Sequence, residues 1–146
     1  MNISQINCEY DKDTFLAKAS LEIDGRKFTA YAKCSPNDKD MESQIVGCEI
    51  ASQKLIIKTL KEYKRDLKIG LASLEQLYYS MNRNKHFNEK SYENKMLQSQ
   101  IQLFKNDLAT VNKTIAEKEQ DLKEYIKIKE ELYVKLRRIR KKGNSN

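Results

Sequence analysis

The chain has 146 residues, with 28 lysines and arginines against 21 aspartates and glutamates, and a formal charge of +7. Hydrophobic residues make up 39% and charged residues 34%, so the chain is less apolar and more charged than an average globular domain. This balance indicates long, solvent-flanked helices rather than one large core. No apolar run reaches the roughly 18 residues of a membrane span, and residues 1–10 lack the pattern of a signal peptide. We therefore expect a cytoplasmic protein without a membrane partner.

Alternating apolar residues near the N-terminus predict a small sheet. From residue 15 to 23 every odd position is apolar, which is the period of a strand with one buried face. Asp24-Gly25 follows, the dipeptide preferred in a two-residue type I′ turn, and residues 28–34 alternate again. Apolar residues within 3–10, followed by a turn at 11–13, indicate one more strand. We predict a three-stranded antiparallel meander.

The three cysteines, Cys8, Cys34 and Cys48, lie in this half of the chain. Their number is odd, none forms a C-x-x-C pair, and His86 is the only histidine, so the ligands of a zinc site are lacking. We expect free cysteines that act as small buried hydrophobes, no intracellular disulfide, no metal and no cofactor.

Helices are predicted for most of the remaining chain. Ser35 can cap a helix, Pro36 suits its first position, and Asp38 lies three residues after the cap, so we predict a helix from about 36 to 82. Residues 83–88 break the pattern and indicate a loop. A second helix is predicted over roughly 89–141.

Apolar residues in both predicted helices follow steps of three and four, the heptad spacing of a coiled coil. In the first helix they are Met41, Ile45, Cys48, Ile56, Leu60, Tyr63, Leu67, Leu74, Leu77 and Met81. In the second they are Leu97, Ile101, Phe104, Leu108, Val111, Ile115, Leu122, Tyr125, Leu132, Leu136 and Ile139. Periodicity leaves two assemblies open: an antiparallel hairpin within one chain, or pairing of the second helix with another copy as a homodimer.

The predicted fold class is α+β: a small antiparallel meander packed on the start of a long helix, followed by a long antiparallel helical hairpin. We expect a sheet-plus-helix head over residues 1–58, a coiled-coil arm over 59–142, and a frayed tail over 143–146. Charge follows this division, because residues 1–40 have a net charge of −1, residues 41–90 of +3 and residues 91–146 of +5.

Two basic clusters are the candidate binding sites. The first is a stripe on one face of the first helix, about 20 Å long at 1.5 Å per residue, which could follow a phosphate backbone. Its members are Lys54, Lys58, Lys61, Arg65 and Lys68. An ordinary solvated helix face is the alternative interpretation.

The second cluster ends the second helix, where residues 135–142 include six basic residues in eight. Its members taken as partner-binding are Arg137, Arg138, Arg140, Lys141 and Lys142. These positive charges are more numerous than is needed to complement the dipole at the end of a helix. They indicate contact with phosphates or with an acidic protein partner. Tyr31, on the outward face of the predicted hairpin, is the candidate for stacking on a base.

Catalysis is not expected. His86 lies in a polar loop without a neighbouring nucleophile, and the four glycines build neither a phosphate-binding loop nor a dinucleotide-binding motif. A heptad hairpin also offers little concave surface for a substrate.

Two short stretches carry a resemblance. The segments Ala-Lys-Cys-Ser-Pro-Asn-Asp at 32–38 and Gly-Cys-Glu-Ile-Ala at 47–51 resemble a segment shared by small proteins from phages and mobile elements of low-GC Gram-positive bacteria. Some members of that group are type II anti-CRISPR proteins, which inhibit Cas9. The resemblance implies a non-enzymatic phage protein that binds Cas9 or its guide-RNA complex. The residues themselves leave a DNA- or RNA-binding accessory protein and a structural coiled-coil protein as alternatives.

Overall fold

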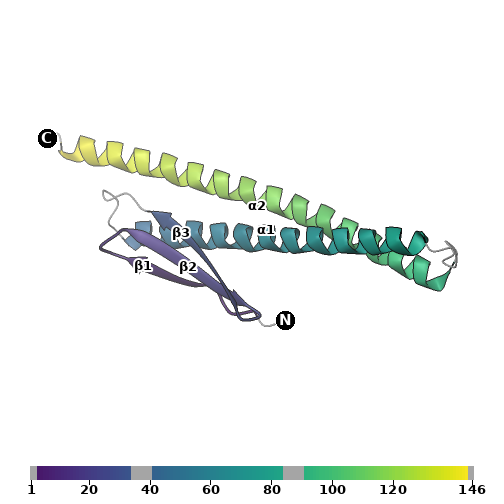
Figure 1. The fold of residues 1–146 in the computed structure, drawn as a ribbon. Helices are drawn as coiled ribbons and strands as arrows, with labels where there is room; N and C mark the ends of the chain where they lie inside the picture. The colour runs from purple at the N-terminus through teal and green to yellow at the C-terminus, as the bar shows by residue number, and fades with distance from the viewer. Residues whose placement is uncertain (1–2, 34–40, 84–90, 145–146) are drawn as a thin grey trace. The chain divides into compact units, whose positions relative to one another are not determined.

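Strand pairing follows the alternation of small apolar residues. The computed structural model describes residues 3–33, 41–83 and 91–144 (Figure 1). Strands β1 (Asn7–Asp11), β2 (Leu16–Ile23) and β3 (Arg26–Lys33) form an antiparallel sheet in the order β1-β2-β3. Ala17 pairs with Ala32 and Ala19 with Ala30, so four small side chains lie together on one face. Residues 3–6, predicted as strand, contribute one isolated bridge, between Ile3 and Ile23.

The two turns of the sheet have different local causes. Asp24 and Gly25 have φ angles of 49° and 79°, the positive values that a type I′ turn requires, as predicted. In the β1–β2 turn the Asp11 carboxylate accepts hydrogen bonds from the N–H groups of Asp13 at 2.9 Å and Thr14 at 3.4 Å. Phe15 leaves this turn with a φ of 58°, a region that costs a non-glycine residue free energy.

Two long helices follow the sheet. Helix α1 covers Met41–Asn82 and helix α2 covers Tyr92–Asn144, which confirms the predicted α+β class with a second long helix packed on the first. Helix α2 begins and ends three residues later than predicted. The predicted cap at 35–38, the loop residues 84–88 and Cys34 lie outside the described residues.

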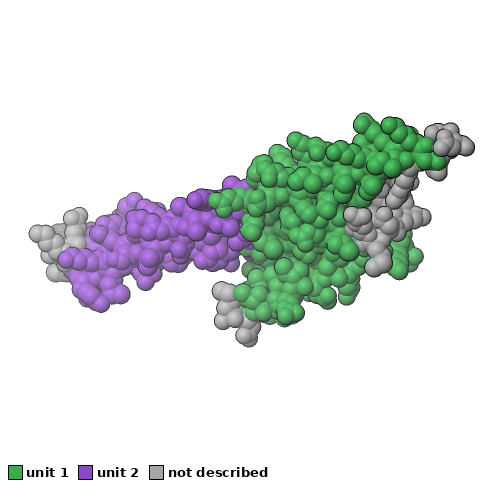
Figure 2. Space-filling model, turned by 180° about the vertical axis from the view of Figure 1, so that it is seen from behind, with its two compact units in different colours: residues 1–59, 117–146 green, residues 60–116 purple. Residues whose placement is uncertain are grey.

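Contacts divide the chain into two units, residues 1–59 with 117–146 and residues 60–116 (Figure 2). In the first unit the sheet packs on α1 around a core of five alanines and two leucines. This core comprises Ala17, Ala19, Leu21, Ala30, Ala32, Ala51 and Leu55. Because alanines face the helix, α1 can lie close to the strands.

The second unit is a hairpin of helical segments from α1 and α2. Its buried residues are Leu67, Val111 and Ile115, with Leu60, Phe104 and Leu108 packed against them. All six belong to the predicted heptad positions. In this unit α2 therefore packs on α1 of the same chain.

Several predicted heptad residues do not lie in a core. Ile45 is 66% exposed and Ile139 is 65% exposed, and Tyr63 and Leu77 are also exposed. In the first unit α1 buries Val46, Ala51 and Leu55 instead. For Ile45 the reason is that the sheet on which α1 packs in this unit determines the buried face of the helix, and not one line of apolar spacing.

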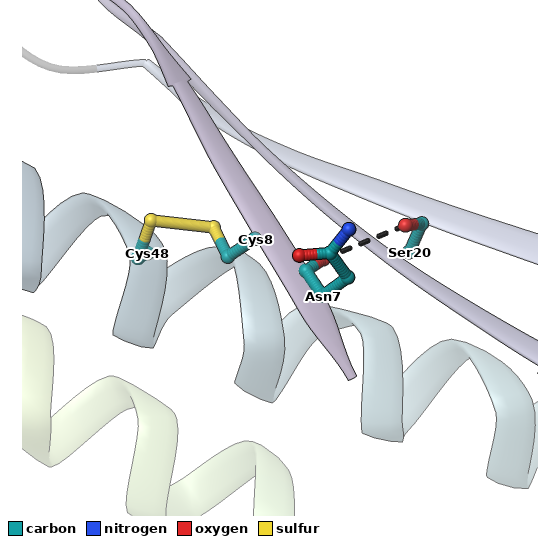
Figure 3. Close-up of a disulfide and its surroundings, with 4 residues drawn as sticks. All are labelled: Asn7, Cys8, Ser20 and Cys48. Carbon is teal, nitrogen blue, oxygen red and sulfur yellow. Dashed lines mark hydrogen bonds between the residues drawn. A yellow bond between two sulfur atoms is a disulfide. The ribbon is translucent and has the colours of Figure 1, made fainter. Parts of the chain in front are cut away.

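The expectation of free cysteines is wrong for two of the three. Cys8 of β1 and Cys48 of α1 form a disulfide, with Cα atoms 5.8 Å apart (Figure 3). Both residues pack against the core of the first unit, because Cys8 lies on the face of β1 that α1 covers. Next to this bond, Ser20 Oγ donates a hydrogen bond to the Asn7 carbonyl at 3.5 Å (Figure 3).

Neither helix, within the described part of the chain, is apolar enough over a sufficient length to cross a membrane.

Candidate nucleic-acid interface

The basic stripe begins beside the open edge of the sheet. In a two-residue hairpin the two residues that flank the turn exchange backbone hydrogen bonds. Along an antiparallel ladder such hydrogen-bonded pairs alternate with pairs whose N–H and C=O groups point away from the partner strand. Counting from Ile23 and Arg26, the N–H and C=O groups of Thr29 and Tyr31 point away from β2. β3 is an edge strand, so these polar groups need other partners.

Lysines of α1 supply partners to the two carbonyls. Lys58 Nζ donates to the Thr29 carbonyl at 2.8 Å, and Lys54 Nζ lies 3.5 Å from the Tyr31 carbonyl. Exposed lysines at a sheet edge also discourage pairing with a further strand. Two of the five predicted stripe residues therefore have a structural role in addition to their charge. The sequence did not reveal this role, because the partners lie 23 and 29 residues apart.

The remaining stripe residues belong to the second unit. Lys61, Arg65 and Lys68 are all exposed. Arg65 Nη1 lies 3.8 Å from Glu62 Oε1, one turn earlier on α1. An ion pair near the surface contributes at most about 1 kcal/mol, but the half-buried Glu62 reduces the positive field of the stripe near Arg65.

The end of α2 is more uniformly basic. The helix continues through this segment to Asn144, and five side chains on it are exposed: Lys135, Arg137, Arg138, Lys141 and Lys142. Arg140 lies on the same helical turns. Their cations complement the negative end of the helix dipole. Ile139 is exposed among them, so this end of α2 presents a cationic surface with one apolar side chain.

Tyr31 takes the position that its alternation predicted. Its side chain is 47% exposed on the sheet face opposite to Ala30 and Ala32, which are buried. Lys18 is its partner across the β2–β3 ladder. The structure thus brings Tyr31 together with Lys18 on its own sheet face and with Lys54 at the strand edge.

A groove between the α1 and α2 segments of the first unit carries both signs of charge, unlike the basic end of α2. It has a volume of about 310 Å³ and is lined by Glu49, Gln53, Ile56, Lys118, Asp121 and Tyr125. Burial, followed by the charge of Glu49 and then Tyr133, raises the pKa of the Tyr125 hydroxyl. The lining mixes both signs of charge, so the groove is a poor site for a polyanion. Within the described residues no three histidine, cysteine, aspartate or glutamate side chains are placed to hold a metal ion.

No protein-family model, curated protein or solved structure matches this chain.

Proposed function

We propose that this protein is a non-enzymatic phage or mobile-element inhibitor that binds Cas9, or its complex with guide RNA, through basic helical surfaces in the cytoplasm of a bacterial host. The observation that supports a binding role is the exposed basic end of α2. The resemblance of residues 32–38 and 47–51 supports the choice of partner.

The chemistry of this end of α2 suits an anionic partner. Arginine makes bidentate hydrogen bonds to phosphate and carboxylate, and its charge persists at any physiological pH. Cas9-type effectors hold guide RNA and DNA in charged channels and recognise the backbone of the heteroduplex. A helix carrying Arg137, Arg138 and Lys141 on its exposed surface could occupy guide-RNA phosphates and so compete with target DNA.

The basic stripe of α1 contributes less in this proposal. Lys58 and Lys54 already contact carbonyls of β3, and Glu62 lies beside Arg65. Lys68 is exposed on the α1 segment of the second unit. We therefore assign the larger share of partner binding to the end of α2.

The disulfide bears on the proposed location. Disulfides are rare in the bacterial cytosol, where thiols are kept reduced. The proposal therefore requires that the protein folds and inhibits with Cys8 and Cys48 reduced, and the bond forms when the protein is exposed to oxidant.

Cleavage of target DNA by Cas9–guide complexes from several Gram-positive species tests the proposal. The wild-type protein should inhibit at least one complex, including at salt concentrations that remove non-specific nucleic-acid binding. A variant with four charges reversed at the end of α2 should lose inhibition. Its substitutions are Arg137→Glu, Arg138→Glu, Lys141→Glu and Lys142→Glu.

The matched control reverses four exposed lysines elsewhere on α2. Its substitutions are Lys95→Glu, Lys105→Glu, Lys113→Glu and Lys123→Glu. It has the same net charge as the test variant and should still inhibit. Equal inhibition by both variants would defeat the assignment to the end of α2. Absence of inhibition across all complexes would defeat the choice of Cas9.

One observation favours the alternative of direct nucleic-acid binding: an exposed aromatic ring lies among lysines on the sheet. A structural coiled-coil protein is the remaining alternative, and it predicts neither inhibition nor binding. Light scattering on the purified protein gives its mass and so separates a monomer with an intrachain hairpin from the alternative homodimer.

A further inference from the structure

Five residues around the exposed face of β3 form what we call the Tyr31 platform: Lys18, Tyr31, Lys33, Lys54 and Lys58. All but Lys18, which is half-buried, are exposed. They come from three different elements, β2, β3 and α1. Only the tertiary structure places them together: Lys18 and Lys33 share the sheet face of the Tyr31 ring, and Lys54 and Lys58 lie at the edge of β3.

The register defines the geometry of the sheet half of the platform. Lys18 and Tyr31 are Cα partners, and they form a pair without backbone hydrogen bonds, the type in which facing side chains lie closest. Lys33 is two residues from Tyr31 on β3 and therefore lies on the same face. The Tyr31 ring thus has one lysine across the ladder and another along its own strand.

The helical half of the platform lies at the strand edge. Lys54 and Lys58 reach the carbonyls of Tyr31 and Thr29. An ammonium group has three donors, so each of these lysines keeps two N–H groups after one hydrogen bond. Because their side chains are exposed, these donors can reach a ligand that passes along the edge of β3.

We infer that the Tyr31 platform binds single-stranded nucleic acid, with an unpaired base stacked on the Tyr31 ring and the flanking phosphates held by the lysines. A base offers its ring face only when it is unstacked, so an exposed aromatic side chain selects single strands over duplex. Cations alone would attract any polyanion, and the half-exposed ring is the feature that distinguishes this surface from the end of α2.

Acidic residues limit the platform on one side. Glu9 of β1 is the cross-strand partner of Lys18, and Glu22 is the partner of Lys27 near the hairpin turn. Both carboxylates would repel a phosphate backbone. The strand of nucleic acid therefore follows β3 and the α1 lysines rather than crossing the sheet toward β1.

This inference does not depend on Cas9 as a partner. Fluorescence anisotropy with a labelled 12-nucleotide single-stranded RNA, the matching DNA, and a blunt duplex of the same length tests it on the full-length protein. We expect the wild type to bind both single strands more tightly than duplex. Tyr31→Ala removes the ring on which the base stacks and should weaken single-strand binding by about 5- to 150-fold, the range for one aromatic–base contact.

Three variants separate stacking from general effects. Tyr31→Phe keeps the ring and should bind within about threefold of wild type, since stacking on a ring face needs no hydroxyl. Tyr79→Ala removes a tyrosine of α1 that is 64% exposed outside the platform and should not change binding. Lys33→Gln, which removes one platform cation, should reduce the slope of log affinity against log salt by about 0.7.

Two results would overturn the inference: no preference of the wild type for single strands, or equal effects of Tyr31→Ala and Tyr79→Ala. The variant with reversed charges at the end of α2 distinguishes this site from the proposed function. It should lose Cas9 inhibition and keep the effect of Tyr31→Ala on single-strand binding. If Tyr31→Ala no longer affects binding in that background, the platform is not an independent site.

Discussion

The ring of Phe104 occupies the space that a side chain at Gly70 would need. A Cβ atom at Gly70 would lie 2.7 Å from Cε1 of Phe104, closer than two carbon atoms approach without repulsion. Phe104 also packs against the buried residues of the second unit. Glycine has a low helix propensity, but at this position of α1 its missing side chain leaves the space that the aromatic ring of α2 fills.

Gly70→Ala should therefore destabilise the protein. Alanine gains about 1 kcal/mol of helix propensity, but forcing the ring aside in a packed core costs about 1–3 kcal/mol. We expect a net loss of about 1 kcal/mol, measured by urea unfolding. Gly143→Ala is the matched control, because no atom lies within 4 Å of a Cβ there. In the double variant Gly70→Ala/Phe104→Leu the loss of stability should be smaller than the sum of the losses in the two single variants. Additive losses would contradict the proposed overlap.

The bond between Cys8 and Cys48 should contribute strongly to stability under oxidising conditions. It closes a loop with a sequence separation of 40, for which the chain-entropy treatment gives about 4 kcal/mol at 25 °C. Reductant should therefore lower the urea midpoint of the wild type. Cys8→Ala should have a low midpoint with or without reductant. A shift of the Cys8→Ala midpoint on reduction would show that another thiol pair is responsible.

Asn94 is a fully buried polar residue in the hairpin of the second unit. Its Nδ2 donates to Asn82 Oδ1 at 3.4 Å, its Oδ1 accepts from Gln98 Nε2 at 3.3 Å, and Asn82 Nδ2 donates to the Tyr78 carbonyl at 2.8 Å. A buried polar residue in a heptad seam specifies register and assembly at a cost in stability. Asn94 is thus suited to hold the two helical segments in one alignment.

Removing this side chain should affect both stability and assembly. Asn94→Ala leaves donors and acceptors without their partner and should cost about 1–3 kcal/mol. Asn94→Leu should preserve more stability but give mixed species by light scattering, because the polar constraint on register is gone. Gln102→Ala breaks an exposed pair with Asn106 and should change stability by no more than about 0.5 kcal/mol. A single, uniform species for Asn94→Leu would argue against a role in register.

Asp11 should link the stability of the β1–β2 turn to acidic pH. Hydrogen bonds from the Asp13 backbone, and then from Thr14, hold the pKa of its carboxyl below the ordinary value. A group whose pKa is lowered by folding stabilises the protein above its unfolded pKa, about 3.9. That contribution is lost as the pH falls through the lower, folded pKa. NMR titration of the Asp11 carboxyl should give a midpoint below that of the same residue in urea-unfolded protein.

Asp11→Asn provides the control for this linkage, because its amide oxygen can still accept hydrogen bonds but carries no charge. The stability difference between wild type and this variant should be constant above about pH 4 and shrink below it. A difference that is independent of pH across this range would exclude the carboxylate as the cause.

Local chemistry made the secondary structure predictable from sequence. The alternation around Ala17, Ala19 and Ala30 specifies strands because successive side chains point to opposite faces. Asp24-Gly25 specifies its turn because both residues tolerate positive φ, and both have it. The heptad spacing around Leu108 and Val111 predicted the buried seam of the second unit, and that seam is confirmed.

Only the tertiary structure decided which distant groups meet. Cys8 and Cys48 are joined, and Lys58 reaches the Thr29 carbonyl, because the sheet packs on α1 at one depth and orientation. The same packing leaves Ile45 exposed although its spacing resembles that of core residues. Periodicity describes how one element could bury a face, whereas the partner that covers the face determines which residues are buried and which lysines reach the sheet edge.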